Sequence, residues 1–361
     1  MRTRKVKETT PPTALPKAAA LLRWYDKHGR DLPWRVKGGK RPDPYKVWLA
    51  EIMLQQTTVA AVIPYYAKFL QLWPTVTALA AADLGDIRAA WAGLGYYRRA
   101  SNLHRCAQVI VTDYAGKFPN TVSTLAQLPG IGTYTSAAVT AIAFDQRANV
   151  VDGNVERVMA RLFRVKKPLR EAKGILRDLA AQLLPKARHG DYAQALMDLG
   201  ATICTPRQPN CPACPWRKAC QARNAGIASQ LPVPASKVIK PVRRAVAFWL
   251  ENAKGEVWLR RRPEEGLLGG MIEVPSSPWL DQDMPEINTI TQYAPAKARW
   301  QRLSLPIRHN FTHFDLYLEI VYACGRASGQ DGFWSAKKAM KSLALPNVMR
   351  KVEAAVRNWR K

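Results

Sequence analysis

Acidic residues are scarce in this chain, which has 27 Asp and Glu against 55 Lys and Arg among its 361 residues. The formal net charge of +28 at pH 7 is far more than solubility requires, and it indicates a polyanionic partner. Long hydrophobic runs are also missing, because no apolar stretch approaches the roughly 18 residues of a membrane-spanning helix. The charge alone fits either a nucleic acid or an anionic membrane surface, and the missing apolar run favours nucleic acid.

A secretory signal is missing as well, since no apolar segment follows the basic N-terminus. Four basic residues stand within the first seven positions, ahead of Pro11 and Pro12, and they predict a flexible basic arm over residues 1–14. A mitochondrial transit peptide is the alternative, which Glu8 and the shortness of the segment disfavour. We therefore expect a cytoplasmic protein, in the nucleoid of a bacterium or in the nucleus or mitochondrion of a eukaryote.

Cysteine is too scarce for a disulfide framework in a chain of this length. Cys106 and Cys324 lie in apolar patterns, where we expect buried small hydrophobic residues. The other four cysteines fall within seventeen residues: Cys204, Cys211, Cys214 and Cys220. Structural zinc usually takes two closely spaced pairs, whereas this segment has one Cys-x2-Cys pair with longer arms on either side. The spacing favours a 4Fe–4S cluster, with zinc as the alternative.

Helical periodicity dominates residues 15–220, which we expect to form an all-α domain. Residues 221–241 carry Pro232 and Pro234 among small residues and are typical of a linker. Residues 242–361 change to strand patterns at 245–250, 257–261 and 316–322, with a turn at 252–255 and a closing helix at 347–359. These predict an α+β domain. The amphipathic helical runs of the first domain are 17–28, 45–55, 59–72, 87–94, 98–114, 122–127, 134–144, 155–163, 170–184 and 192–203.

A glycine-containing turn, Leu128-Pro-Gly-Ile-Gly-Thr-Tyr134, connects two of the predicted helices. Gly130 and Gly132 let the helices meet in a tight hairpin and leave the first N–H groups of the second helix uncovered. Such a helix start binds a phosphate without a basic side chain. The turn therefore predicts contact with a DNA backbone, and an ordinary helix–helix turn is the alternative.

Two acidic residues differ in their sequence environments. Glu51 has Val47, Trp48 and Leu54 as helical neighbours, so a buried carboxyl there would have a raised pKa and could act as a general acid. Asp152 opens a helix, where a carboxylate is stabilised as an anion. A neutral acid and an anion are the pair that glycosidic cleavage needs. The alternatives are a buried acid paired across the fold for Glu51 and a helix cap for Asp152.

Together, the glycine turn, the aspartate that follows it and the four-cysteine loop resemble the helix-hairpin-helix DNA glycosylases of the endonuclease III superfamily. Three segments are similar to adenine DNA glycosylases of the MutY type: Trp48 to Thr57, Gly93 to Tyr97 and Val151 to Val158. The resemblance covers residues 15–220. It implies a monomeric, multidomain base-excision repair enzyme with an all-α helix-hairpin-helix core and a 4Fe–4S loop. Its partner would be double-stranded DNA containing adenine opposite 8-oxoguanine or guanine, and not a membrane.

The resemblance also implies roles for individual residues. Glu51 would protonate adenine, and Asp152 would stabilise the sugar cation, with Asn154 positioning it and Tyr134 acting near the sugar. Endonuclease III-like enzymes carry a lysine nucleophile where this chain has Tyr134, so a monofunctional glycosylase that uses water is expected. Leu94 and Tyr96 have helix-end packing as their alternative role. Four residues match positions that contact or wedge near the opposing oxidised guanine: Gln56, Thr57, Leu94 and Tyr96.

The C-terminal part, residues 242–361, resembles the Nudix-like domain of MutY enzymes, which helps to recognise 8-oxoguanine. His309-Asn-Phe-Thr-His313 is similar to the lesion-reading loop of that domain, with Thr312 in place of the usual serine. His309 and His313 have local hydrogen bonding in a loop as their alternative role. The Arg-Glu-x-x-Glu-Glu run of true Nudix hydrolases is absent from the sequence, so we expect no nucleotide diphosphatase activity.

Two other functions remain as alternatives. One is a pyrimidine-lesion glycosylase and lyase related to endonuclease III, which Tyr134 and the additional C-terminal domain disfavour. The other is a non-catalytic iron–sulfur protein that binds DNA or senses redox state, which the contrasting environments of Glu51 and Asp152 disfavour.

Overall fold

A computed structural model of the protein describes residues 15–36, 40–234, 239–281, 287–303, 306–327 and 331–359. The chain divides into two compact units. The predicted basic arm, residues 1–14, lies outside the described residues. Unit 1 comprises Met1–Gln55, Thr75–Ala80 and Arg105–Lys237, and unit 2 comprises Gln56–Pro74, Ala81–His104 and Val238–Lys361.

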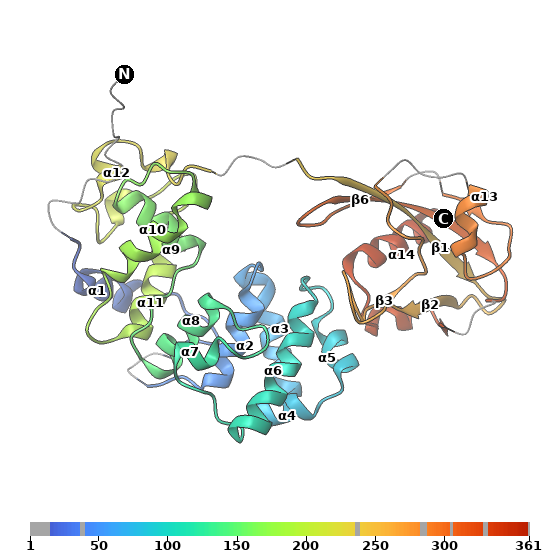
Figure 1. Ribbon diagram of the computed structural model, residues 1–361, viewed down its shortest axis with the longest axis horizontal. Helices are drawn as coiled ribbons and strands as arrows, with labels where there is room; N and C mark the ends of the chain where they lie inside the picture. The colour runs from blue at the N-terminus through green and yellow to red at the C-terminus, as the bar shows by residue number, and fades with distance from the viewer. Residues whose placement is uncertain are drawn as a thin grey trace. The chain divides into compact units, whose positions relative to one another are not determined.

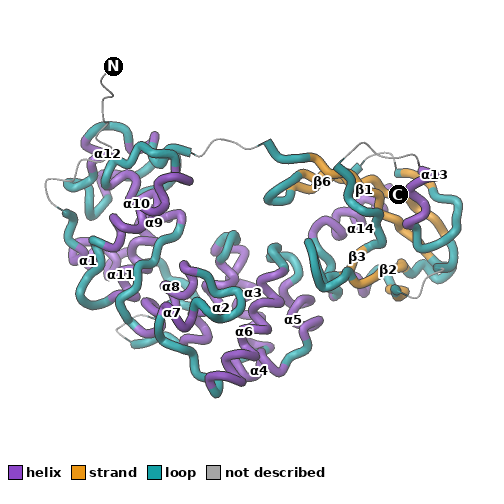
Figure 2. The backbone as a smooth tube through the Cα atoms, viewed as in Figure 1, coloured by secondary structure: helices purple, strands orange, loops and turns teal. Residues whose placement is uncertain are grey.

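Unit 1 is helical, as the apolar periodicity predicts (Figures 1 and 2). Helices at 98–114 and 134–144 match their predicted ranges to within one residue, whereas the run at 192–203 divides into an α-helix and the π-helix Leu199–Ile203. The α-helices that lie wholly or partly in unit 1 are α1 (Ala18–His28), α2 (Pro44–Leu54), α4 (Val76–Ala81), α6 (Arg98–Tyr114), α7 (Val122–Leu125), α8 (Thr133–Phe144), α9 (Gly153–Leu162), α10 (Leu169–Ala181), α11 (His189–Asp198) and α12 (Gln221–Asn224).

Helix α8 is the central element of unit 1. It packs against α2 and α11, and α11 in turn packs against α1. Every residue of α8 from Thr135 to Ala143 is buried, and most of them are small, so neighbouring backbones can approach closely. This packing fixes the N-terminal end of α8, where Tyr134 lies, relative to the buried helix α2.

Residues 221–234 are folded, although the sequence predicts them as the first part of a linker. They form α12 and the 3₁₀ turn Ala228–Gln230, and they belong to unit 1. The physical reason is contact with a distant helix, because the buried Arg161 side chain donates to the backbone oxygen of Leu231 at 2.8 Å. Of the remaining predicted linker, residues 235–238 lie outside the described part of the chain.

Unit 2 contains α3 (Val59–Leu72), α5 (Leu84–Trp91) and the start of α6, together with the predicted α+β domain. That domain has a seven-stranded sheet of order β3-β2-β1-β6-β4, with β5 paired to β6 and β7 paired to β2. Helix α14 (Asn347–Trp359) packs against β5, and α13 (Ile287–Ile290) is a short additional helix. The strands are β1 (Val242–Glu251), β2 (Val257–Arg261), β3 (Ile272–Glu273), β4 (Gln301–Arg302), β5 (Ile307–Asn310), β6 (Asp315–Cys324) and β7 (Phe333–Ser335).

The register of the sheet follows from its turns and its long central strands. Strands β1 and β6 are parallel, with Val242 opposite Asp315 and Glu251 opposite Cys324. The predicted turn between β1 and β2 is confirmed, since Gly255 has φ +75° and donates to the oxygen of Asn252 at 2.9 Å. The expected burial of Cys324 is wrong, because this residue ends β6 and is exposed, whereas Cys106 is buried as expected.

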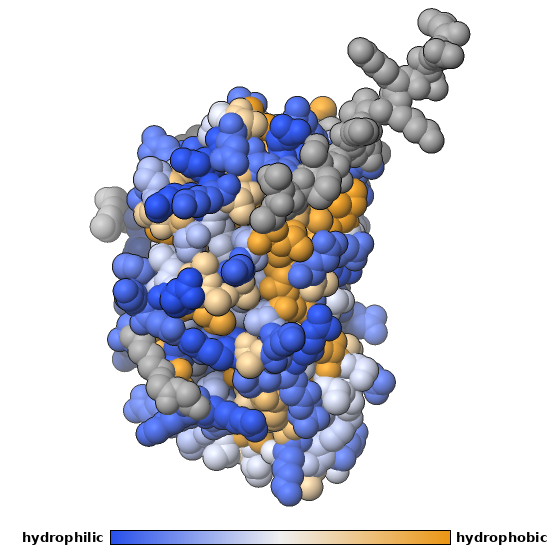
Figure 3. Space-filling view, turned by 90° about the vertical axis from the view of Figure 1, so that its left-hand side faces the viewer, coloured by the Kyte–Doolittle hydropathy of each residue, from blue (hydrophilic) through white to orange (hydrophobic). Residues whose placement is uncertain are grey.

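Within the described residues, no helix is both long enough and apolar enough to span a bilayer. Figure 3 shows one face of the molecule, on which hydrophilic side chains predominate around smaller hydrophobic areas. A face of this kind agrees with the excess of Lys and Arg in the sequence.

Candidate functional site

Glu51 is a buried carboxyl group near the C-terminal end of α2. The helix begins where the Asp43 side chain accepts the Tyr45 N–H at 2.9 Å, with Pro44 at its first position. Because α2 packs on α8, Glu51 is only 4% exposed. Burial raises the pKa of Glu51 from 4.5 to about 7, since the charged carboxylate loses its hydration. Glu51 can therefore hold a proton near neutral pH.

Tyr134 and Asp152 come from other elements and act on Glu51 directly. The Tyr134 hydroxyl donates to Glu51 Oε2 at 2.8 Å, which lowers the pKa of Glu51, while the charge of Asp152 raises it. Burial, followed by the charges of Glu51 and Asp152, raises the pKa of Tyr134 well above its usual value, so the phenol remains a proton donor. The structure thus brings Glu51, Tyr134 and Asp152 together within unit 1.

Asp152 is the N-cap of α9 and is half-buried. Its Oδ1 accepts the backbone N–H of Val155 at 2.8 Å, and its Oδ2 accepts an N–H from the Asn154 side chain at 2.8 Å. A carboxylate at this position is stabilised by the helix dipole and by both donors. Asp152 therefore caps α9, which is the alternative role that the sequence analysis gives for it. Asn154 holds the Asp152 carboxylate, whose charge acts on Glu51.

The glycine turn before α8 is open to solvent. Gly130 has φ +75°, a left-handed conformation that favours glycine. Gly132 caps α8 without a side-chain hydrogen bond, and a Cβ built there would meet no atom within 4 Å. Leu128 and Ile131 are buried and anchor the turn. The first N–H groups of α8 are therefore accessible to an external acceptor.

Arg157 joins Asp152 to the cysteine loop through Asn154. Its guanidinium donates to Asn154 Oδ1 at 2.8 Å, to the Gly200 oxygen at 2.7 Å and to the Cys204 oxygen at 2.8 Å. Gly200 lets the π-helix approach α9 closely at Asn154, because a Cβ at Gly200 would lie 2.6 Å from the Asn154 Cβ. The side chain that holds Asp152 is thereby tied to the backbone of the cysteine loop.

Arg161, one helical turn further along α9, organises the same loop. It is 1% exposed, and its guanidinium donates to the oxygens of Thr205 and Pro206 at 2.7 and 2.8 Å. A further N–H points to Cys204 Sγ at 3.2 Å. A buried cation that faces a sulfur atom and backbone oxygens stabilises negative charge on that sulfur. Arg161 therefore holds the backbone of the cysteine loop in place beside Cys204.

The four clustered cysteines line one small cavity. Burial raises the pKa of Cys214 to about 12; a backbone N–H of Trp216 lowers it, and the charges of Cys204, Cys220 and Cys211 raise it further. The four cysteines are therefore near enough to interact, and four cysteines around one cavity are a donor set that a 4Fe–4S cluster or a zinc ion binds as thiolates. Among the residues that the structure describes, no group of three or more Cys, His, Asp or Glu is arranged to hold a single metal ion.

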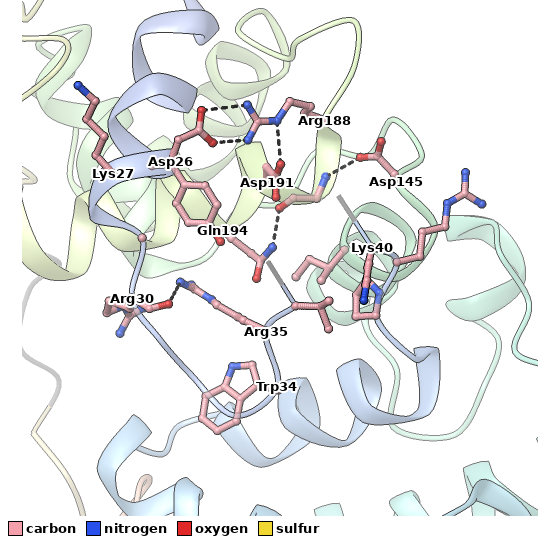
Figure 4. A pocket seen from close by; sticks show the side chains of 17 residues that line it. Asp26, Lys27, Arg30, Trp34, Arg35, Lys40, Asp145, Arg188, Asp191 and Gln194 are labelled. Carbon is pink, nitrogen blue, oxygen red and sulfur yellow. Dashed lines mark hydrogen bonds and ion pairs between the residues drawn. The ribbon is translucent and has the colours of Figure 1, made fainter. Parts of the chain in front are cut away.

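A cavity of about 690 Å³ in unit 1 is lined by Arg30, Arg35 and Arg188 among other residues (Figure 4). Arg35 lines this cavity, and its charge lowers the pKa of Glu51. Arg30 and Arg35 are both held by the fully buried carboxylate of Asp198 at 2.6 Å. Across the cavity, Arg188 is held by two acidic side chains (Figure 4). The lining is thus rich in cations whose positions are fixed by ion pairs.

In unit 2, Arg99 gathers three of the predicted DNA-contacting positions. Its guanidinium donates to Thr57 Oγ1 at 3.0 Å and to the backbone oxygens of Leu94 and Gly95 at 3.3 and 3.0 Å. Its charged end also lies 5.6 Å from the ring centre of Tyr96. Leu94 is 7% exposed, which agrees with its alternative packing role, whereas Tyr96 is 48% exposed and has φ +49°. Gln56 also has a positive φ, +58°.

The predicted lesion-reading segment lies at the turn between β5 and β6. His309 belongs to β5, and burial followed by the charge of Lys351 lowers its pKa. Thr312 and His313 are exposed at the turn. The Thr312 hydroxyl lies 3.3 Å from the Tyr96 hydroxyl, and both residues belong to unit 2. The structure therefore brings together two residues that the sequence connects with the same base.

Sequence reasoning missed five supporting residues, all of which are buried or act through distant partners. Arg157 and Arg161 share one face of α9 with Asn154, and this helical spacing is a signal that could have identified them. Arg35 and Asp198 contact each other across 163 residues of sequence, and Arg99 reaches Thr57 across 42, so no local pattern identifies these contacts. The five residues are Arg35, Arg99, Arg157, Arg161 and Asp198.

Two family profiles match the chain. The profile of the HhH-GPD superfamily base excision DNA repair protein matches residues 49–185. The profile of the NUDIX domain matches residues 246–355. A solved structure of a thermostable thymine-DNA glycosylase superimposes with a TM-score of 0.52 and 32% identity, covering 58% of this chain and 95% of that one.

Curated relatives carry a single name in bacteria and mammals. The adenine DNA glycosylase of Buchnera aphidicola subsp. Acyrthosiphon pisum is 32% identical over 320 residues, which cover 83% of this chain and 84% of the relative. The adenine DNA glycosylase of Homo sapiens is 36% identical over 359 residues, covering 83% of this chain. The chain spans 65% of the length of the human relative, just under two thirds.

Proposed function

The chain belongs to the adenine DNA glycosylase family, and on this premise we propose that it hydrolyses the N-glycosidic bond of adenine mispaired with 8-oxoguanine or guanine in double-stranded DNA. The observation that carries the proposal is the group formed by Glu51, Tyr134 and Asp152. A buried, protonated carboxyl beside a capped carboxylate suits an acid for the departing base and an anion for the oxocarbenium-like sugar.

In the proposed reaction, the adenine nucleotide first leaves the base stack, at a cost of a few kcal/mol that a mispair reduces. Glu51 donates its proton to the adenine ring while the bond between the sugar C1′ and the base nitrogen breaks. The bonding electron pair leaves with the base, and Asp152 stabilises the cation that remains on the sugar. Water then bonds to C1′ and gives its proton to a carboxylate, which completes the hydrolysis.

Tyr134 supports a monofunctional reaction. The lyases of the superfamily form a Schiff base through an amine at this position, and a phenol whose pKa is raised well above its usual value is a poor nucleophile. Its hydroxyl is instead directed at Glu51. We therefore propose that the DNA strand stays intact until alkali is added.

The DNA contacts are proposed from positions in both units. In unit 1, the open N–H groups after Gly130 and Gly132 would bind a backbone phosphate. In unit 2, seven residues would contact the mispaired purine or the DNA around it, with Arg99 positioning Thr57, Leu94 and Tyr96. The seven residues are Gln56, Thr57, Leu94, Tyr96, His309, Thr312 and His313.

We also propose that Cys204, Cys211, Cys214 and Cys220 hold a 4Fe–4S cluster. The shared cavity, the mutual effect of the thiols and the Arg161 contact to Cys204 Sγ support a four-cysteine metal site, and the single Cys-x2-Cys pair with longer arms on either side favours the cluster over zinc. When bound, the cluster would supply iron–thiolate cross-links that fix the loop. Arg157 would transmit the position of that loop to Asn154 and Asp152. An iron-to-sulfide ratio near one and visible iron–thiolate absorption would distinguish the cluster from zinc.

The decisive experiment is a single-turnover assay on duplexes with adenine opposite 8-oxoguanine, G, T or C, analysed with and without alkali. We expect alkali-dependent cleavage, fastest opposite 8-oxoguanine, and its loss in Asp152→Asn and Glu51→Gln. Full activity of both variants would reject the catalytic assignment. A covalent adduct trapped by borohydride would instead favour the glycosylase and lyase alternative. Tight lesion binding without release of free adenine would favour the non-catalytic alternative.

A further inference from the structure

Arg88 is a buried cation on α5 that takes no part in the proposed excision. Its side chain is only 5% exposed, so the guanidinium has lost most of its hydration and needs partners that compensate for the loss. It donates to Ser101 Oγ on α6 at 3.1 Å and to both carboxylate oxygens of Glu264, at 3.0 Å to Oε1. Glu264 belongs to the Nudix-like domain. The pair therefore joins that domain to the α5–α6 segment, residues 84–101, within unit 2.

The loop that carries Glu264 is shaped to receive the guanidinium of Arg88. The Gly270 N–H donates to the Pro263 oxygen at 3.0 Å, which closes the loop around Glu264. A Cβ at Gly270 would lie 2.2 Å from Arg88 Nη1, and the φ of +67° at Gly270 also favours glycine. Arg88 therefore lies against the backbone of this loop as well as binding its carboxylate.

Two other contacts between the α5–α6 segment and the Nudix-like domain are weaker. Tyr96 and Thr312 share one neutral hydrogen bond of 3.3 Å between exposed hydroxyls. Burial raises the pKa of Tyr97, and the backbone N–H of Asn347 lowers it, so this hydroxyl lies beside the start of α14. A charge-assisted hydrogen bond is roughly twice as strong as a neutral one, and the contact of Arg88 is bidentate. Arg88 therefore makes the strongest of the three contacts.

The position of Thr312 relative to Tyr96 depends on how the domain is held. Arg99 fixes Tyr96 on the α5–α6 segment, with its charged end 5.6 Å from the ring centre, whereas the Nudix-like domain carries Thr312. Both residues are proposed to contact the mispaired purine or the DNA around it. Recognition by two side chains from different segments requires that their separation be held closely. The recognition of that purine should therefore depend on Arg88, although the Arg88 side chain is buried.

We propose that Arg88 is a positioning residue that determines specificity for the opposing purine, because it docks the Nudix-like domain on α5 and so holds Thr312 beside Tyr96. The inference rests on the proposed function, since it concerns how such an enzyme distinguishes 8-oxoguanine from guanine. The release of adenine itself, which we assign to Glu51 and Asp152 in unit 1, should not depend on Arg88.

Glu264 offers a clean perturbation, because its side chain is 62% exposed and can be changed without opening a cavity. Glu264→Lys places a second cation beside Arg88. Glu265→Lys is the matched control, because Glu265 is exposed in the same loop and its substitution changes the net charge equally. A general gain in DNA affinity from the added charge is then common to both variants. Arg88→Gln, Arg88→Lys and the double variant of Arg88→Gln with Glu264→Lys complete the set, all in the full chain with its metal site loaded.

The first measurement is the single-turnover rate of adenine release opposite 8-oxoguanine divided by the rate opposite G. We expect Glu264→Lys and Arg88→Gln each to lower this ratio about tenfold, because a hydrogen bond between charged groups is lost. The rate opposite G should stay unchanged, whereas impaired folding would lower both rates. Arg88→Lys should recover part of the ratio, since it keeps the charge but lacks the guanidinium fork. The double variant should lose about tenfold rather than about hundredfold, because both substitutions break one contact.

The second measurement is amide hydrogen exchange in residues 84–91 and 262–271 without DNA, which reports docking independently of excision. We expect faster exchange in Glu264→Lys and Arg88→Gln, and unchanged exchange in Glu265→Lys. The inference is overturned if the rate ratio or the exchange is unchanged in the first two variants, if Glu265→Lys has the same effect, or if both rates fall in parallel. A wild type that releases adenine from none of the duplexes would reject the proposed function, and this inference with it.

Discussion

Replacing Tyr134 by phenylalanine should move the alkaline limit of base excision to higher pH. The Tyr134 hydroxyl stabilises the charged form of Glu51 through a hydrogen bond of 2.8 Å, and this bond opposes the effect of burial on the pKa of Glu51. A hydrogen bond to a charged group is worth roughly 1.5–3 kcal/mol, and one pKa unit corresponds to about 1.4 kcal/mol. Because the protonated carboxyl also accepts this bond, its removal should raise the pKa of Glu51 above about 7 by less than the full energy of the bond.

The assay is the single-turnover rate of adenine release as a function of pH. A general acid must be protonated, so the rate should fall as pH rises through the pKa of Glu51, and the midpoint of that fall should shift upward in Tyr134→Phe. Tyr192→Phe is the control, because Tyr192 is a buried tyrosine of the same unit whose hydroxyl has no hydrogen-bond partner among the described residues. An unchanged midpoint in Tyr134→Phe, or one moved to lower pH, would refute the assignment of Glu51 as the acid.

Three further predictions concern stability, positioning and the cysteine loop. Because the pKa of Glu51 is raised from 4.5 to about 7, its contribution to stability is present below about pH 4.5 and is lost as pH rises through 7. Glu51→Gln should therefore stabilise the protein at pH 8 by up to about 3 kcal/mol, and by much less at pH 5. Denaturant unfolding of both proteins at the two pH values measures this difference. Arg157→Gln should lower the single-turnover rate by up to about 100-fold through a displaced Asn154, with at most a small shift of the alkaline midpoint because the charge of Asp152 remains; an unchanged rate would contradict this role. Cys214→Ser should lose bound iron and its visible absorption, and full iron retention would contradict the ligand assignment.

Local patterns predicted the helices well, because an amphipathic periodicity requires only neighbours along the chain. Residues 98–114 and 347–359 form helices over the predicted ranges for that reason. Contacts between distant segments were not predictable in the same way. The helical neighbours of Glu51 include no cation, yet Arg35 approaches it from the segment before α2. Residues 221–234 have a composition typical of a linker, but Arg161 gives their backbone a buried hydrogen-bond partner.

The two carboxyl groups of the candidate site could be identified because secondary structure alone separates their environments. Glu51 lies within a buried helix, and Asp152 lies at the start of another helix with two donors. The structure adds a coupling that the sequence could not predict, since the charge of Asp152 is one cause of the raised pKa of Glu51.

This coupling changes how the loss of activity in Asp152→Asn must be interpreted. The substitution removes the anion beside the sugar, and it also lowers the pKa of Glu51 because a neutral amide no longer opposes its ionisation. A smaller fraction of Glu51 is then protonated near neutral pH, so part of the lost rate belongs to the acid and part to the anion. The two parts separate at low pH, where Glu51 is protonated in both proteins and only the anion's contribution remains missing. The rate ratio between wild type and Asp152→Asn should therefore be smaller at pH 5 than at pH 8.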